Sequence, residues 1–490
     1  MQHPLWRLLL LLLLVTALPG TRGREREALR LLEWSQGYVS SGVAMERVSG
    51  GGVGVLSVQS LPQGHVVFRT PLESCLSYPR AKELMPSLGS LDTSLPEFAV
   101  MALFLAEARL VLDSSTAAGE SAGWVKEVEE YVEWLPREAT GVLGWTEAEV
   151  QEMLGGAAAE WLREDIRRRQ DAALSVFHAL GNYSAAPGLN SSVFLAYRRA
   201  CLEEEGWDAP CIFDGEVVED SPWRAQASMS FQALVWGLEM LQSRVHSVEV
   251  REKSSSEASW SSLKMLVPLA DALNTGTPQE WNTQCYTEEN GEYFTCSLSR
   301  GVRKGQELLV SYGGARSPLR NSQLFLDYGF ALSRNDVPED VFPFGSGGPS
   351  LSLPAIKGCL SSAEKTDGSE KWREKHCWWL PHRARIRDAL AQIVHGMGET
   401  SLEEDVQALQ AYLDVGEDDD KAFSSPGQHC SGPHCRGRRI SALQVLIALK
   451  RSQLEALHLL RTDSASEREH EGGAGRGTPG EGRERAAEEL

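Results

Sequence analysis

The sequence predicts an α+β fold. Strand-like segments come first, helical patterns interrupt them, strands return, and a helical region follows. This order differs from the regular strand–helix alternation of parallel-sheet proteins. The chain has 490 residues, more than one average domain, and 42% of them are hydrophobic, which is typical of a globular protein. We therefore expect a β-rich domain over residues 24–335, with a helical insertion at about 95–260, and a mainly helical domain over 336–461.

Hydrophobic periodicity predicts the individual elements. β-branched runs separated by Gly and Pro predict short strands and turns from Gly51 to Pro71. Strand patterns return at Met265–Ala270, Glu292–Leu298 and Gly305–Gly314. Apolar residues at helical spacing predict helices at Leu95–Leu112, Glu147–Leu154, Trp161–Leu180, Ser230–Val245, Arg385–Val394, Leu402–Leu413 and Ile440–Leu460.

Three segments outside these elements have biased compositions. Residues Pro343–Pro354 are rich in Gly, Pro and Ser, which indicates a linker or short strands. Residues Gly416–Arg439 are first acidic and then rich in Ser, Gly, Pro and Cys, which indicates a loop. Residues Thr462–Leu490 are rich in Gly, Glu and Arg without an apolar period, so we expect a disordered tail.

The N-terminus has the pattern of a secretory signal peptide. An apolar run, Leu8–Leu18, follows Arg7 and precedes small residues near position 23. The run is shorter than the ~20 residues that span a bilayer, so we favour a signal peptide over residues 1–23 and keep an uncleaved membrane anchor as the alternative. Two glycosylation sequons, at Asn182 and Asn190, fit a luminal protein. We expect the mature protein to reside in the lumen of the secretory pathway, outside the cell or in a complex plastid. We expect it to contact a membrane only transiently, through the signal peptide.

Charge and cysteine content narrow the function classes. The formal net charge is −20, which disfavours nucleic-acid binding and suits a basic substrate such as a lysine side chain. Nine scattered cysteines do not form the dense framework of a small disulfide scaffold. The cluster from His429 to Cys435 has irregular spacing, so we expect no metal there. A Cys430–Cys435 disulfide and unpaired loop residues both remain open.

The polar residues with the strongest functional signal follow predicted strands. The chain has no phosphate-binding G-x-x-x-x-G-K-[ST] motif and no G-x-S-x-G nucleophile motif. The Gly-rich segment at Gly50 precedes a strand rather than a helix, which argues against a dinucleotide loop. Asp271 and Asn274 come directly after a buried strand pattern, and Tyr312-Gly ends a later one. A third segment ends in Tyr328-Gly-Phe.

These segments resemble the SET domain of protein methyltransferases of the Rubisco large-subunit lysine methyltransferase type, a group that includes an actin-histidine methyltransferase. The resemblance covers about residues 45–461 and includes Gly52-Val-Gly54-Val, Met101-ALFLAE, Gly144-WTEAEV and the helix from Phe231 to Arg244. It implies a β-rich SET domain with inserted helices, followed by a helical substrate-binding domain. In one departure, Asn274-Thr275 stands where the family usually has Asn-His.

The resemblance implies a methyl transfer from S-adenosyl-L-methionine to a protein. Tyr312 matches the catalytic tyrosine and would hold the acceptor amine. Asn274 would bind the amino-acid end of the cofactor, and Arg244 its carboxylate. The remaining residues expected at the cofactor site are Gly52, Val53 and Gly54, where the backbone would approach the cofactor; Asp271 and Thr275, beside Asn274; and Tyr328 and Phe330, which would line the adenine or lysine pocket.

Each of these residues also has a structural interpretation. A Tyr at a strand end often packs, an Asn often starts a turn, and an Arg often ends a helix. The expected function is lysine methylation of a non-histone protein by a monomer. One alternative is histidine methylation. The other is a SET-fold protein-binding module with impaired catalysis, which is suggested by Thr275 in place of the usual His. The resemblance does not identify the acceptor protein.

Overall fold

The structure is a computed structural model of two compact units. Unit 1 comprises residues 1–154, 162–337 and 409–445, and unit 2 comprises residues 155–161, 338–408 and 446–490. The placement of the chain is described for residues 30–48, 52–86, 88, 95–113, 120–138, 141–180, 222–251, 260–313, 318–337, 339–343, 350–362, 377, 379, 383–395, 402–414 and 433–474. The predicted signal peptide, both sequons and Cys430 lie outside these residues.

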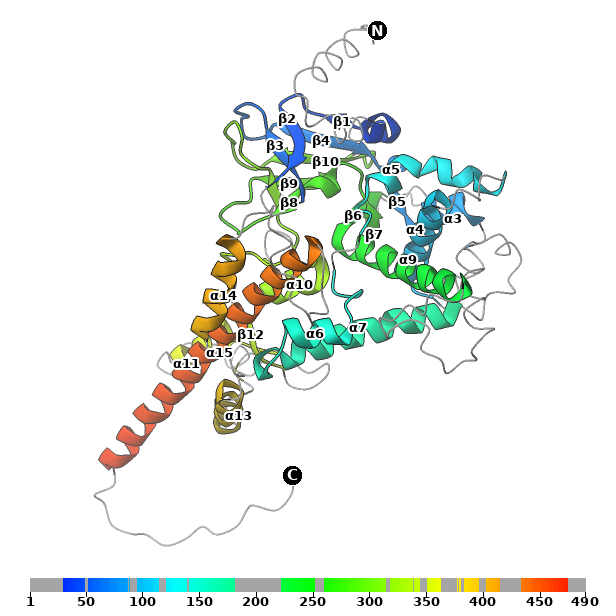
Figure 1. The fold of residues 1–490 in the computed structure, drawn as a ribbon. Coiled ribbons are helices and arrows are strands. Elements are labelled where there is room, and N and C mark those ends of the chain that lie inside the picture. Colours follow the sequence, from blue (N-terminus) through cyan, green and yellow to red (C-terminus); the bar gives the residue numbers. More distant parts are fainter. Residues whose placement is uncertain are drawn as a thin grey trace. The chain divides into compact units, whose positions relative to one another are not determined.

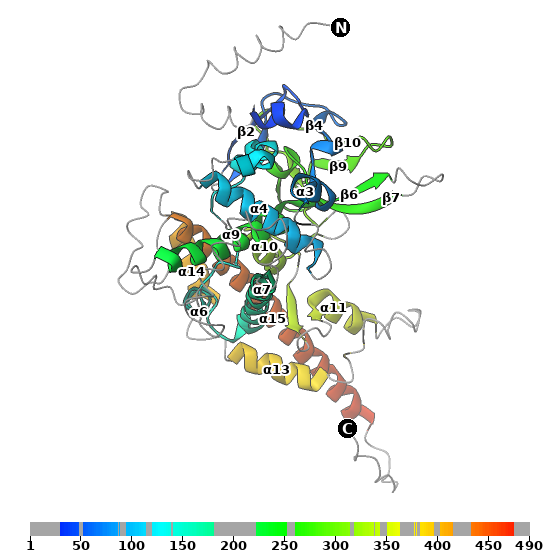
Figure 2. The same ribbon diagram turned by 90° about the vertical axis from the view of Figure 1, so that its right-hand side faces the viewer.

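A four-stranded antiparallel sheet is the largest sheet of unit 1 (Figures 1 and 2). Its strands lie in the order β1 (Tyr38–Val39), β4 (Val66–Pro71), β10 (Tyr293–Leu298) and β9 (Thr283–Thr287). A disulfide joins Cys285 of β9 to Cys296 directly opposite on β10. The sheet therefore brings residues near position 70 next to residues near position 290.

Three smaller sheets contain the other strands found in the described residues of unit 1. They are β2 (Val43–Arg47) with β3 (Val53–Ser57); β5 (Leu76–Ser77), β7 (Trp260–Leu266) and β6 (Val245–Arg251); and β8 (Asn274–Thr275) with β11 (Leu309–Val310). The pairing of β8 with β11 is parallel, whereas the others are antiparallel. This parallel pair places the segment after Asp271 beside the segment before Tyr312.

Helices of the insertion pack against the strands. Among the described residues up to 330, the α-helices with both ends described are α3 (Tyr78–Leu84), α4 (Glu97–Asp113), α5 (Glu129–Trp134), α6 (Glu147–Met153), α7 (Glu160–Ala179), α9 (Pro222–Arg244) and α10 (Asn321–Tyr328). Figures 1 and 2 show α4 and α9 side by side. They approach so closely that a Cβ on Gly237 would lie 2.4 Å from the carbonyl oxygen of Ala102. Glycine is therefore required at this crossing.

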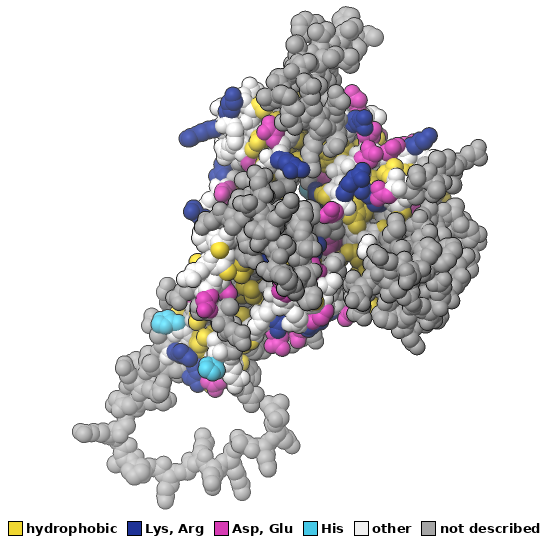
Figure 3. Space-filling model, in the orientation of Figure 1, with side chains coloured by type: hydrophobic (Ala, Val, Ile, Leu, Met, Phe, Trp, Pro, Cys, Tyr) yellow, Lys and Arg dark blue, Asp and Glu magenta, His cyan; other side chains and the backbone are white. Residues whose placement is uncertain are grey.

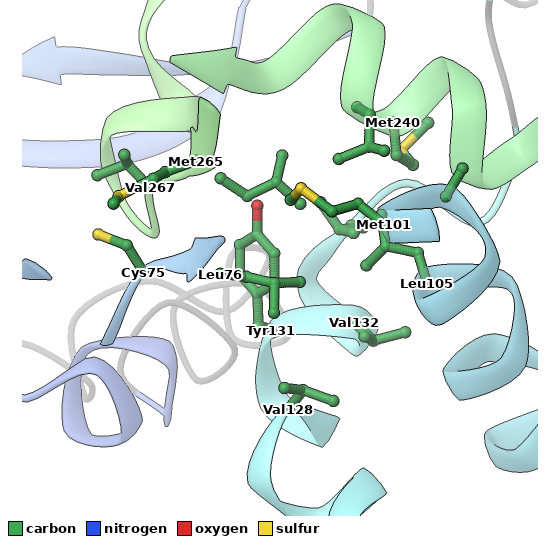
Figure 4. Packing of buried hydrophobic residues seen from close by; sticks show 14 of the residues in the cluster. Cys75, Leu76, Met101, Leu105, Val128, Tyr131, Val132, Met240, Met265 and Val267 are labelled. Atoms are coloured by element: carbon green, nitrogen blue, oxygen red, sulfur yellow. The ribbon is translucent and has the colours of Figure 1, made fainter. Parts of the chain in front are cut away.

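The core of unit 1 joins the insertion to the strands. Tyr131 of α5 is fully buried, and Figure 4 shows its ring among apolar side chains that include Leu76, Met101 and Val132. A second anchor is the buried carboxylate of Glu239 on α9, which accepts hydrogen bonds from the backbone N–H groups of Gly141, at 2.9 Å, and of two neighbouring residues. These contacts fix α9, whose last residue is Arg244.

Unit 2 has its own small core around Trp379, which is fully buried. A disulfide between Cys359 and Cys377 crosses this core, and Lys450 pairs with Asp405 where both side chains are buried. After residue 330, the strands and α-helices of the described residues are β12 (Asp340–Pro343), β13 (Ser350–Ser352), α11 (Leu353–Ser362), α13 (Arg383–His395), α14 (Leu402–Asp414) and α15 (Pro433–Ala474).

The α+β prediction is confirmed, and most predicted helices lie within two residues of their expected bounds. The helix predicted from Ser230 begins earlier, at Pro222. Three other predictions need correction. The strand predicted at Met265–Ala270 ends at Leu266, because Pro268 has no N–H group to donate and Leu269 has a positive φ of 74°. β13 lies within the Pro343–Pro354 segment, where a linker or short strands were expected, and α11, a helix that was not predicted, follows it.

The other two corrections concern the C-terminal helix, α15. It begins at Pro433, inside the predicted loop, and it continues to Ala474, so the predicted disorder from Thr462 is wrong for residues 462–474. The apolar residues that recur at helical spacing along α15 are not all buried. Leu446 and Leu457 are buried, whereas Leu454, at a similar spacing, is 38% exposed.

The surface carries both signs of charge. On the face shown in Figure 3, positive and negative side chains of the described residues are interspersed. Of the helices in the described ranges, none has the length and apolar content to cross a membrane.

Candidate functional site

The segment from the end of β7 through β8 carries three of the predicted site residues, Asp271, Asn274 and Thr275. After Leu269, whose positive φ turns the chain, a short 3-10 helix spans Ala270–Ala272, and β8 begins at Asn274. Leu269 is fully buried, so packing holds this uncommon conformation, which costs about 1–3 kcal/mol. β8 then aligns Asn274 with Leu309 of β11. The turn at Leu269 therefore brings Asp271 and Asn274 to the parallel pair of β8 and β11.

Asn274 contacts the predicted glycine turn directly. Its Nδ2 donates to the backbone oxygen of Val53 at 3.0 Å and to Oε1 of Glu307 at 2.9 Å. A Cβ on Gly54 would lie 2.4 Å from Glu307 Oε1 and 3.0 Å from Asn274 Nδ2, so a larger residue would require these side chains to move. The structure thus brings Val53, Gly54 and Asn274 together.

Gly52 differs from Gly54. Its backbone oxygen accepts a hydrogen bond from the N–H of Val48 at 3.1 Å, which closes the turn between β2 and β3. An added Cβ at Gly52 would meet no atom of the described residues within 4 Å. Packing within the described protein therefore does not require glycine at position 52.

Arg244 ends α9 and faces the same loop. Its Nη1 donates to the backbone oxygen of Asp271 at 3.0 Å. Its Nε is buried and has no hydrogen-bond partner among the described residues. A buried guanidinium nitrogen without an acceptor is unusual, because such groups are almost always paired. This donor is therefore available to a ligand.

Asp271 is a buried carboxylate beside Arg244. Its Oδ2 accepts a hydrogen bond from the Tyr131 hydroxyl at 3.0 Å, while its Oδ1 has no partner in the described part of the chain. Burial raises the pKa of Asp271 above its ordinary value, whereas the charge of Arg244 and the Tyr131 hydrogen bond act in the opposite direction. The side chain therefore links the site to α5, in addition to any role in holding its own loop.

Tyr312 lies in a turn rather than at the end of a long strand. The segment predicted as one strand pairs in pieces: Glu307 bridges to Leu56, and Leu309–Val310 form β11. The Tyr312 hydroxyl donates to the backbone oxygen of Leu273 at 3.1 Å. The Tyr312 ring lies at the site, as predicted. The predicted strand before it is shorter than expected, because residues 307–310 pair with different segments of the chain.

Two further aromatic residues pack around Tyr312. The ring of Tyr328 stacks on it at 4.5 Å between centroids, with 29° between the planes, and Phe330 meets it edge-on at 6.4 Å. Tyr328 ends α10, and Gly329 allows the chain to turn there with a φ of 77°. The C-terminus of α10 thereby supplies both predicted aromatic residues to the site.

Electrostatic interactions connect these groups. Burial raises the pKa of Tyr312 far above that of an ordinary tyrosine, the positive charge of Arg244 opposes this shift, and the charges of Asp271 and Glu307 add to it. Burial also raises the pKa of Tyr328 to about 12. Both hydroxyl groups therefore remain protonated at neutral pH.

Thr275 follows Asn274 on β8 and is buried. With Tyr312, Trp281, Leu324 and Asn335 it lines a small, partly open pocket. The indole N–H of Trp281 donates to Gly276, so this side of the pocket is fixed. The departure from Asn-His thus lies beside the predicted catalytic tyrosine.

Two residues of this site were not among those predicted from the sequence. Glu307 contacts Asn274, and Tyr131 contacts Asp271. A signal for Glu307 was present, because a charged residue precedes the apolar run Leu308–Val310 in a predicted strand. Tyr131 had no comparable local signal. Within the described residues, no group of three His, Cys, Asp or Glu side chains could hold a metal ion.

No protein-family model matches the sequence, and no curated protein matches it. Solved structures do match the fold. The SET domain of LSMT bound to lysine and AdoHcy aligns with 91% of this chain and 93% of its own, at 13% identity and a TM-score of 0.54. Rubisco LSMT bound to AdoMet aligns with 92% and 97%, at 14% identity and a TM-score of 0.51. Rubisco LSMT bound to sinefungin and monomethyllysine has the same coverage and identity, with a TM-score of 0.52.

These comparisons establish the class of fold. The chain has an α+β fold similar to that of SET-domain structures, over about nine tenths of its length. The resemblance inferred from the sequence is therefore confirmed at the level of the fold.

Proposed function

We propose that this chain is an S-adenosyl-L-methionine-dependent protein-lysine N-methyltransferase that acts on a non-histone protein. The observation that carries the proposal is the meeting of Asn274, Arg244 and Tyr312 around one loop of a SET-type fold. The similar structures contain AdoMet, AdoHcy or sinefungin, and lysine or methylated lysine.

The residues present fit the amino-acid end of such a cofactor. Arg244 offers an unpartnered buried Nε, which suits a carboxylate. Asn274 directs its Nδ2 to protein acceptors, and so leaves its Oδ1 to accept from an ammonium group. Val53 and Gly54 form the adjoining backbone. The donor and the acceptor are complementary to the two charges of an amino acid.

The chemistry requires little beyond alignment. When bound, S-adenosylmethionine supplies an electrophilic methyl group. The acceptor lysine must be neutral, and burial among the rings of Tyr312, Tyr328 and Phe330 favours its neutral form, since burial lowers an amine pKa from ~10.4. Positioning of reactants in this way can contribute about 7–11 kcal/mol to a rate acceleration.

Tyr312 would hold the acceptor amine through its oxygen. The hydroxyl proton is directed to the backbone oxygen of Leu273. The lone pairs of the hydroxyl oxygen can therefore accept a hydrogen bond from an amine N–H group. Because the raised pKa keeps Tyr312 protonated, the residue acts as a fixed dipole and not as a base.

Calorimetry with S-adenosylmethionine tests this proposal. We expect the native chain to bind and Asn274→Ala to bind at least about tenfold more weakly, since a hydrogen bond to a charged group contributes about 1.5–3 kcal/mol. Asn290→Ala is the matched control, because Asn290 lies in the exposed turn between β9 and β10. If the native chain shows no binding at millimolar cofactor, the enzyme proposal fails and a protein-binding module is favoured.

Labelled methyl transfer to lysate proteins identifies the acceptor. Label on a lysine side chain supports the proposal, whereas label on a histidine would replace it with histidine methylation. We expect the acceptor to be recognised in part by the helical region predicted over residues 336–461, of which unit 2 contains residues 338–408 and 446–461.

We also propose that the chain functions in an oxidising compartment, reached by the predicted N-terminal signal. Two disulfides support this, Cys285–Cys296 in unit 1 and Cys359–Cys377 in unit 2, because such bonds persist mainly outside reducing compartments. Peptide mapping of the native protein without reductant should find both pairs linked. Free thiols at these four positions would contradict the proposal.

A further inference from the structure

We infer that Glu307 is a positioning residue that orients the Asn274 amide, with its oxygen toward the cofactor. The inference rests on the proposed function and assigns a role to a residue outside the predicted site. Glu307 Oε1 lies 2.9 Å from Asn274 Nδ2. The carboxylate would act on the ligand only through this amide.

The orientation of the amide follows from its two neighbours. The backbone oxygen of Val53 and the carboxylate of Glu307 are both acceptors without a proton to give. Only the nitrogen of Asn274 can satisfy both, so the amide oxygen must point the other way. In the described part of the chain, no donor contacts this oxygen.

Val53 alone would fix the amide less firmly. With only one acceptor, a half-turn of the amide would exchange oxygen and nitrogen at the cost of one hydrogen bond. The NH₂ group would then face the ligand's ammonium, where two donors meet and neither is satisfied. With Glu307 present, the same half-turn would break two hydrogen bonds instead of one. The negative charge of Glu307 also strengthens the hydrogen bond that it accepts.

Glu307 is itself held in place by its backbone. Its carbonyl oxygen accepts from Asn282 Nδ2 at 2.8 Å, and the N–H of the next residue, Leu308, donates to Val55 at 2.7 Å. Gly54 provides the space for the carboxylate, because any Cβ there would lie 2.4 Å from Oε1. Asn282 and Val55 thus hold the backbone on either side of the Glu307 peptide group, and Gly54 leaves the space in which the carboxylate meets the amide.

A double-mutant cycle tests whether Glu307 acts through Asn274. The probe is S-adenosylmethionine, and the readout is its calorimetric Kd with the full chain. We expect Glu307→Ala to raise Kd about tenfold, in line with the loss of a hydrogen bond to a charged group. In the Asn274→Ala background the same change should alter Kd less than about twofold, because the residue through which it acts is absent.

The conservative variant separates orientation from charge. Glu307→Gln keeps an acceptor oxygen for Asn274 and removes the charge, so it should recover most of the affinity lost in Glu307→Ala. Glu289→Ala, at an exposed position of the β9–β10 turn, is the matched control for loss of a carboxylate. The melting temperature of each variant shows whether the fold is intact.

Three outcomes overturn the inference. They are native affinity in Glu307→Ala, an equal loss in the Asn274→Ala background, and a loss in Glu307→Gln as large as that in Glu307→Ala. If Glu307→Ala does not fold, Glu307→Leu, which also lacks an acceptor for Asn274, takes its place in the cycle with the same expected changes in Kd. Absence of binding by the native chain would instead refute the proposed function, so the two failures are distinguishable.

Discussion

Replacement of Tyr312 by phenylalanine separates catalysis from packing. The change removes the hydroxyl that donates to Leu273 and keeps the ring that stacks on Tyr328 at 4.5 Å. The edge contact with Phe330 is also retained. The variant therefore isolates the role of one hydroxyl group.

The expected loss of stability is small. The backbone oxygen of Leu273 loses its donor, and an unsatisfied buried group costs about 1–3 kcal/mol. A loss of 1 kcal/mol lowers the melting temperature of a domain of 150–250 residues by about 2–4 °C. Some decrease in melting temperature is thus expected even if Tyr312 is catalytic.

The expected loss of activity is much larger. Removal of one hydrogen-bonding group that acts in the transition state lowers turnover by about 10²–10³ in other enzymes. Partial unfolding cannot produce this effect, because a protein with about 5–15 kcal/mol of stability stays folded after the loss of 1 kcal/mol. The two magnitudes distinguish the catalytic role from the packing role.

The assay measures turnover at saturating S-adenosylmethionine, together with cofactor Kd and melting temperature. Tyr286→Phe is the matched control, because Tyr286 is 44% exposed on β9. We expect the Tyr312→Phe variant to bind cofactor normally and to turn over at least 100-fold more slowly. A variant with the full native rate would show that Tyr312 only packs, and damage confined to Tyr312→Ala would agree with that result.

Two further predictions concern the core of unit 1. Burial, with a smaller effect from the charge of Asp271, raises the pKa of the Cys75 thiol from 9.0 to about 12, so Cys75 should resist iodoacetamide at about pH 8.5 until the protein unfolds. Because the folded state holds this proton more tightly, stability should fall as the pH rises from about 9 through about 12; alkylation of Cys75 in the native protein would contradict this. Gly237→Ala places a Cβ 2.4 Å from the Ala102 oxygen and should destabilise the protein by about 1–3 kcal/mol in urea unfolding. Gly123→Ala, which meets no atom of the described residues within 4 Å, is its control, and equal stability of the two variants would refute the packing argument.

Helix positions were predictable from the sequence where local signals coincide. The helix predicted from Glu147 begins there because a capping box precedes it. The Thr146 hydroxyl oxygen accepts from the Glu149 N–H at 3.2 Å, and the Glu149 carboxylate accepts from the Thr146 N–H. The tail beyond Thr462 shows the limit of such reasoning. Its composition indicates disorder, yet it continues an amphipathic helix whose preceding turns are buried, and an existing helix extends at little cost.

The strand before Tyr312 was mispredicted for a different reason. Its residues have strand-like periodicity, but pairing depends on partners that are more than 30 residues away in the sequence. Leu308 bonds to Val55, whereas Leu309 aligns with Asn274. Similarly, no local pattern predicts the positive φ at Leu269, a residue that is fully buried and whose carbonyl oxygen accepts from the Ala272 N–H.

The site residues were predictable by type but not by contact. Asn274 and Tyr312 were identified by resemblance, and the structure places both at one loop. Glu307 was not identified, because its importance depends on the space beside Gly54 and on the direction of one amide. Neither property can be seen in the sequence around position 307.

The pairing of Arg244 with Asp271 argues that this loop is a binding site and not merely a core. Their charges interact, yet Arg244 donates to the backbone oxygen of Asp271 and leaves its own Nε unpaired, while Asp271 leaves Oδ1 unpaired within the described residues. Each unpaired buried group costs about 1–3 kcal/mol, a cost that a purely structural pair would avoid with a direct salt bridge. A ligand that accepts from Nε removes part of this cost on binding. The unpaired guanidinium nitrogen therefore favours a carboxylate ligand at the end of α9, where the amino-acid end of the proposed cofactor would lie.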